Sequence, residues 1–71
     1  MQPVVIRYKK MAKMLGVSVT EAEKVHDDLI AKGYMEVLYG SDKMRFVRMS
    51  SPDPQIAAYL HQTRAPIIFT K

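Results

Sequence analysis

The segment Met14-Leu-Gly-Val-Ser-Val-Thr-Glu-Ala-Glu-Lys24 decides the fold of this 71-residue chain. Gly16 is the residue type that most readily ends a helix, because it adopts a left-handed backbone at little cost. Ser18 is a favourable N-cap, and Glu21 stands at the capping-box position three residues later. The segment therefore predicts a helix that ends at Gly16, a tight turn, and a second helix that begins after Ser18.

Apolar periodicity supports both helices. Met11, Ala12 and Leu15 fall at i, i+1 and i+4, which predicts a short helix from Lys9 that Gly16 ends. Residues 19–32 separate on a helical wheel into two sides, and Gly33 is expected to stop this second helix. Its apolar side holds Ala22, Val25, His26, Leu29 and Ile30, and its polar side holds Thr20, Glu23, Lys24 and Asp27.

β-like runs surround these helices. The run Pro3-Val-Val-Ile-Arg-Tyr8 has three β-branched residues after its proline and predicts a strand. The runs 34–39 and 44–49 flank a loop with glycine and aspartate, which predicts a β-hairpin.

The C-terminal part begins with a break at 51–54. There Asp53 as N-cap and Pro54 as first residue predict a helix through Gln62, with Ile56, Tyr59 and Leu60 on its apolar side. The β-like tail 65–71 could pair with residues 4–7, pair with another chain, or stay mobile.

The order of these elements resembles the winged helix-turn-helix family, in particular bacterial regulators of the MarR and GntR types. The resemblance covers roughly residues 6 to 50. It rests on Met11-Ala-Lys-Met-Leu-Gly-Val-Ser18 and on Leu29-Ile-Ala-Lys-Gly-Tyr-Met35, which resemble the first helix with its turn and the end of the recognition helix. It implies an α+β fold with a short strand, helix, turn, recognition helix and β-hairpin wing, to which this chain adds a C-terminal helix.

The resemblance also sets the expected organisation of the chain. Residues 1–50 form the winged helix-turn-helix core, and residues 51–71 belong to the same domain or form a dimer contact. The family usually has a helix before its first strand, which is missing here; the helix at 54–62 fills that gap, or does so in a partner subunit. We expect a homodimer whose contact uses Ile56, Tyr59, Leu60, Ile67, Ile68 and Phe69.

Composition narrows the function. The chain has no cysteine, so disulfides and thiolate chemistry are excluded, and no apolar run approaches the length of about 20 residues that a bilayer span needs. We therefore expect a soluble cytoplasmic protein. Neither a phosphate-binding glycine loop nor a nucleophile motif is present, and the two histidines do not have ligand spacing, so we expect neither an enzyme nor a metal or cofactor site.

The charge of the chain is unevenly distributed. The net charge is +4, and two basic segments, 7–13 and 42–48, flank the acidic segment 18–33. The family resemblance implies double-stranded DNA binding by a transcriptional regulator, most simply a repressor. The expected contacts are Ser18, Thr20, Glu23, Lys24 and Asp27 on the recognition helix, Lys9, Lys10 and Lys13 on the first helix, and Lys43, Arg45 and Arg48 on the wing.

The acidic recognition helix leaves a second interpretation open. Glu21, Glu23, Asp27 and Asp28 together repel phosphate. Either the basic residues on the first helix and the wing supply the affinity for DNA, or the acidic face around Glu23, Asp27 and Asp28 docks on a basic partner protein. In the second case the chain is a winged-helix adaptor.

Overall fold

The chain begins its fold with strand β1 (Val4–Arg7), which passes directly into helix α1 (Tyr8–Leu15). The structure is a computed structural model, and it describes residues 2–71. Helix α1 starts one residue before the predicted Lys9, and the side chain of Arg7 at its N-cap makes no capping hydrogen bond. The first two predicted elements are confirmed.

The turn between the helices forms as the sequence predicts. Gly16 has a φ of 71°, and its N–H and that of Val17 donate to carbonyl oxygens of α1. The Ser18 hydroxyl accepts a hydrogen bond of 3.1 Å from the backbone N–H of Glu21 and opens helix α2 (Val19–Ala31). Gly33, with a φ of 86°, follows the end of α2.

The remaining elements are strands β2 (Met35–Gly40) and β3 (Met44–Met49), helix α3 (Pro54–Thr63) and strand β4 (Ile67–Thr70). The predicted hairpin is confirmed, with a register shift between Val37 and Tyr39. Helix α3 begins where expected, because a carboxylate oxygen of Asp53 accepts a hydrogen bond of 2.9 Å from the N–H of Gln55.

The sheet brings the two ends of the chain together. Its strand order is β1-β4-β3-β2, with β4 parallel to β1 and antiparallel to β3. Of the three alternatives for the tail, pairing with residues 4–7 is the one observed. The C-terminal part 51–71 therefore contributes a strand to the same sheet as the expected 1–50 core. The first residue of that core lies outside the described part of the chain. Strand β4 separates β1 from the hairpin.

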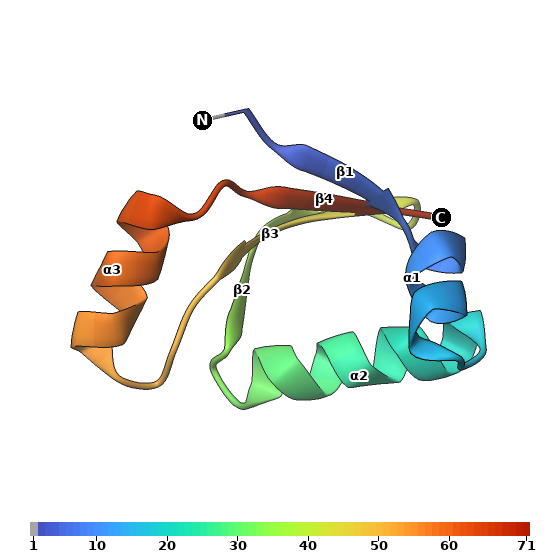
Figure 1. Cartoon of the computed structure of the whole chain (residues 1–71), viewed down its shortest axis with the longest axis horizontal. Coiled ribbons are helices and arrows are strands. Elements are labelled where there is room, and N and C mark those ends of the chain that lie inside the picture. The colour runs from blue at the N-terminus through green and yellow to red at the C-terminus, as the bar shows by residue number, and fades with distance from the viewer. Residues whose placement is uncertain (1) are drawn as a thin grey trace.

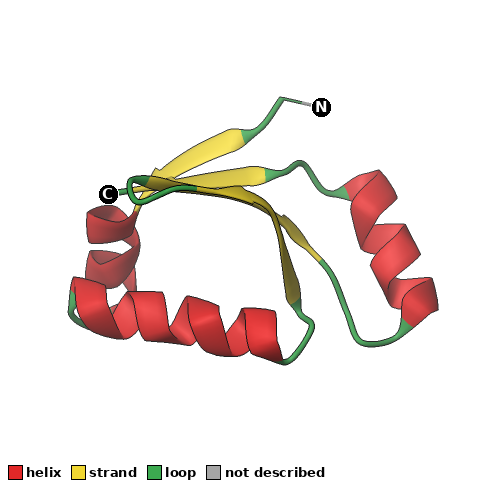
Figure 2. Ribbon diagram, turned by 180° about the vertical axis from the view of Figure 1, so that it is seen from behind, coloured by secondary structure: helices red, strands yellow, loops and turns green. Residues whose placement is uncertain are grey.

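Figures 1 and 2 show α2 running along one face of the sheet, α1 at one end and α3 at the opposite end. The core lies between the sheet and α2, and its buried cluster consists of Tyr8, Met35, Val47 and Phe69. No helix within residues 2–71 combines the length and the apolar character that crossing a membrane requires.

One expectation about a buried face was wrong, and one of the two alternatives for the C-terminal helix is not observed. Val25 was placed on the inner side of α2, but it is 45% exposed, because the sheet and α1 cover only the side that carries Ala22 and His26. Helix α3 packs beside β3, at the far end of the sheet from α1, so it does not supply the missing first helix within this chain. Ile56 and Tyr59 on its predicted apolar side are exposed.

Candidate nucleic-acid interface

Helix α2 presents its predicted outer residues to solvent. Ser18, Thr20, Lys24 and Asp27 are exposed, and Glu23 is half-buried. The start of α2 carries unpaired backbone N–H groups and the positive end of the helix dipole, which favour an anion. The side chains named from the sequence therefore lie where a ligand could reach them.

The acids of α2 are paired within the molecule. Asp27 accepts from the Arg45 guanidinium at 3.1 Å, and Asp28 lies 2.8 Å from the ammonium of Lys32. Glu23 lies 3.9 Å from the ammonium of Lys71. Exposed pairs of this kind contribute little stability, but they neutralise local charge. Three of the four acids of this helix thus have a cation within 4 Å.

The three predicted wing residues separate into different environments. Arg45 faces α2 and is held by Asp27, whereas Arg48 points to the other face of the sheet, where its guanidinium lies 3.0 Å from Glu36. Both were expected to contact DNA, and both form ion pairs within the chain. Lys43 lies in the hairpin loop, is exposed and makes no side-chain ion pair with residues 2–71.

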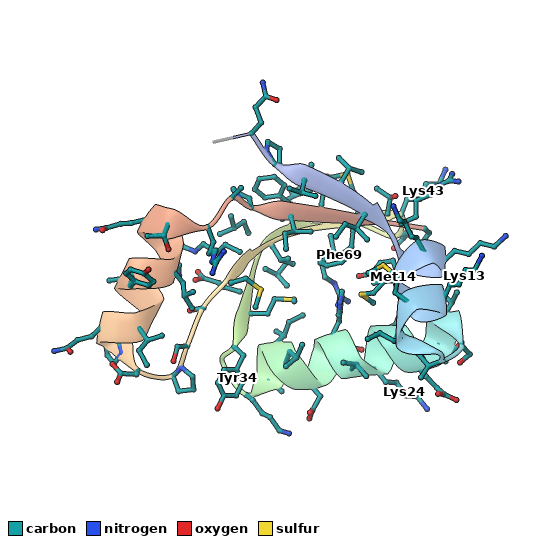
Figure 3. All side chains as sticks on the ribbon, viewed as in Figure 1. Lys13, Met14, Lys24, Tyr34, Lys43 and Phe69 are labelled. Atoms are coloured by element: carbon teal, nitrogen blue, oxygen red, sulfur yellow. The ribbon has the colours of Figure 1, made fainter. Side chains whose placement is uncertain are left out.

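The free cations gather at one end of the molecule. Lys9, Lys10 and Lys13 are exposed on α1, and none is ion-paired with another described residue. Figure 3 shows Lys13 and Lys43 projecting at the end where α1 lies, with Lys24 below them on the first half of α2. We call this set, from three separate segments, the basic end: Lys9, Lys10, Lys13, Lys24 and Lys43.

A polar cleft of about 260 Å³ adjoins the basic end. It lies between the start of α1, the outer side of α2 and the hairpin loop, and it contains both acidic and basic groups. Its lining consists of Tyr8, Glu23, Asp27, Ser41, Asp42, Met44, Arg45 and Lys71. Sequence reasoning missed this cleft, because its walls come from segments that are distant along the chain.

Three aromatic rings, those of Tyr8, His26 and Phe69, pack together in the interior beside the cleft. The His26 ring lies 4.2 Å from the Phe69 ring and 5.4 Å from the Tyr8 ring, measured between centroids. His26 is 4% exposed, and its Nδ1 has no hydrogen-bond partner among residues 2–71. Burial lowers the pKa of His26, and Arg45 lowers it further, while Asp27 acts in the opposite direction. The imidazole is therefore neutral near pH 7.

Tyr8 responds to the same surroundings. Burial raises the pKa of its phenol, Arg45 opposes this shift, and the carboxylates of Glu23 and Asp27 add to it. The hydroxyl consequently stays protonated near pH 7. No group of three His, Asp or Glu side chains within residues 2–71 could hold a metal ion.

Comparisons with known proteins found no match to this chain. No family model, no curated protein and no solved structure matches the chain. The functional interpretation therefore depends on the residues themselves.

Proposed function

We propose that this protein binds double-stranded DNA through the basic end and acts as a small transcriptional regulator. Lysines on α1 and the hairpin loop hold phosphates, and the outer side of α2 faces the base edges. Phosphate contacts supply affinity and position, whereas base contacts supply sequence selectivity. Repression by occupying an operator is the simplest mode of action for such a chain.

One observation supports this proposal above the others. The unpaired lysines of the basic end lie at the same end of the molecule, while Glu23, Asp27 and Asp28 each have a cation of the same chain within 4 Å. The acidic sequence of α2 therefore repels phosphate less than its composition suggests. On the exposed part of α2, Lys24 is suited to donate to guanine O6 and N7.

The protein-docking alternative draws support from the exposure of Asp27 and Asp28, whose side chains are 63% and 59% accessible. Their pairing with Arg45 and Lys32 removes much of the charge that a basic partner needs. We therefore place DNA binding first. A partner protein lost on changing both aspartates to asparagine, without any gain in DNA affinity, would favour docking instead.

A matched pair of charge variants tests the DNA proposal. Lys43→Ala removes one cation from the basic end, and Arg64→Ala removes one exposed cation beside α3, at the other end of the molecule. Lys43→Ala should reduce the steepness of log K against log salt by about one unit and weaken binding to all duplexes alike. Arg64→Ala should leave the slope unchanged.

Equal effects of these two variants would mean that net charge, and not the basic end, determines binding. Lys24→Ala separates the two kinds of contact further. It should chiefly relax the choice of sequence, because Lys24 lies on α2 and not on the phosphate-binding lysine face of α1.

A further inference from the structure

The face of the sheet opposite α2 carries a row of apolar side chains across all four strands. Val5 of β1 pairs with Ile68 of β4, Ile68 with Phe46 of β3, and Phe46 with Tyr39 of β2. Directly opposite residues on neighbouring strands share one face. Val47 and Phe69, the neighbours of Phe46 and Ile68 along the chain, are buried toward α2, so this outer row points away from α2.

Within residues 2–71 the two edge residues of the outer row are exposed, and its two middle residues, Phe46 and Ile68, are half-buried. Val5 is 62% exposed and Tyr39 is 60% exposed. Helix α3 packs beside β3 at one margin of this face, where the Nε2 of His61 lies 3.8 Å from Glu36, and Figures 1 and 2 show no helix over β1 and β4 on the side away from α2. The charged residues of the face stand at its margins. Arg7 lies near one end, and the Arg48–Glu36 ion pair lies near the other. The centre of the face is therefore uncharged.

We propose that the outer row is the contact surface for a second copy of this chain, with the two sheets packed face to face. Four strands about 4.8 Å apart and about 16 Å long give a face of roughly 300 Å² in projection. With side-chain relief, two such faces bury on the order of 1,000 Å² of accessible surface, the lower bound for a specific interface. An apolar patch of this size matches the largest patch on a typical soluble protein, which is often an interaction site.

The small core of the chain favours a second copy as the occupant. Only six hydrophobic residues are buried among those described. A domain of this size has little core to stabilise it, and association of identical chains is one common remedy. A flat face with its charges at the margins can pack against itself across a two-fold axis without bringing charged groups into its centre.

The arrangement also suits the DNA proposal, on which this part of the inference rests. With the two-fold axis parallel to the strands, both basic ends lie at the same end of the dimer. Sheets pack about 10 Å apart, and a helix packs on a sheet at a similar distance, which separates the two copies of α2 by about 30 Å. One turn of DNA is about 34–36 Å, so the two helices approach the spacing of successive half-sites.

This surface differs from the dimer contact expected from the sequence. Of the residues named there, Ile68 belongs to the outer row, whereas Phe69 and Ile67 lie on the core side of β4. Ile56 and Tyr59 are exposed on α3, which is not part of the row, and provide a matched comparison.

Sedimentation equilibrium of three full-length proteins tests the proposal. They are the wild type, the double variant Val5→Lys/Tyr39→Lys on the outer row, and the double variant Ile56→Lys/Tyr59→Lys on α3. Both variants add the same charge at exposed positions, and circular dichroism checks that each is folded. The wild type and the α3 variant should have twice the 8.1 kDa chain mass at micromolar concentration. The row variant should have the mass of one chain.

A monomeric wild type, or an α3 variant that is monomeric while the row variant is dimeric, would overturn the proposal. If the lysine variant of the row does not fold, Val5→Thr/Tyr39→Thr keeps the strand propensity and should weaken dimerisation by more than about tenfold. No weakening by that variant would also overturn the proposal. The mass measurement needs no DNA, so a dimer that fails to bind DNA would refute only the proposed function.

Discussion

Replacing Asp27 by asparagine tests directly whether an acidic helix can face DNA. The change removes the 3.1 Å ion pair with Arg45 and nearly preserves the size of the side chain. Because Asp27 is largely exposed, the free energy of unfolding should fall by less than about 1 kcal/mol. The released guanidinium becomes available to a phosphate, and one carboxylate no longer repels the polyanion.

The magnitude follows from counterion release. One additional phosphate contact steepens the slope of log K against log salt by about 0.9, which corresponds to roughly three- to tenfold tighter binding near 0.1 M salt. Fluorescence anisotropy with a random-sequence duplex measures both quantities. Asp28→Asn is the control, because it removes the same charge but releases Lys32 at the other end of α2, away from the basic end.

Weaker binding by Asp27→Asn would refute this reasoning. It would mean that the carboxylate makes a favourable contact, for example by accepting from cytosine N4, or that the Asp27–Arg45 pair holds the wing in its binding position. A selected sequence and a random one distinguish these outcomes, since loss of a base contact lowers affinity for the selected sequence alone.

Three further predictions concern stability. Burial lowers the pKa of His26, so below about pH 6.5 the unfolded chain binds a proton that the folded chain does not, and the free energy of unfolding should fall as the pH drops from 7 to 5. Urea titrations should show a smaller pH dependence for His26→Phe than for the wild type. An unchanged pH dependence would contradict a lowered pKa of His26. Val47 is fully buried, so Val47→Ala should cost about 2–3 kcal/mol, whereas Val25→Ala on exposed α2 surface should cost less than about 1 kcal/mol in the same urea titration. Gly16→Ala should lower the free energy of unfolding by about 1 kcal/mol, because φ is 71°, although the added methyl group meets nothing within 4 Å. An unchanged stability in thermal unfolding would show that the turn relaxes.

Local signals in the sequence predicted the elements well. Gly16, Ser18 and Asp53 act through atoms within a few residues, so the helix boundaries that they define agree with the structure. The hairpin is also local, since only residues 41–43, with Asp42 among them, separate its two strands, and Gly40 ends the first strand. These features require no knowledge of how distant segments meet.

The features that the sequence did not predict depend on distant contacts. Insertion of β4 between β1 and β3 decides which side chains of the tail are buried, and periodicity left three alternatives for that tail. Arg45 pairs with Asp27 eighteen residues away, and Arg48 pairs with Glu36 across the hairpin. The sequence named both arginines as DNA contacts but did not predict these partners within the chain. The polar face of α2 was predicted correctly, but the partners that neutralise it were not.

Binding of the wild-type protein to random-sequence duplex DNA at low and moderate salt tests the central claim most directly. The basic end predicts micromolar-range affinity at low salt that falls steeply as salt increases, because several lysines displace counterions together. Absence of binding at low salt, from a protein shown to be folded by circular dichroism, would contradict DNA binding and make the exposed acids of α2 the next surface to test with basic proteins.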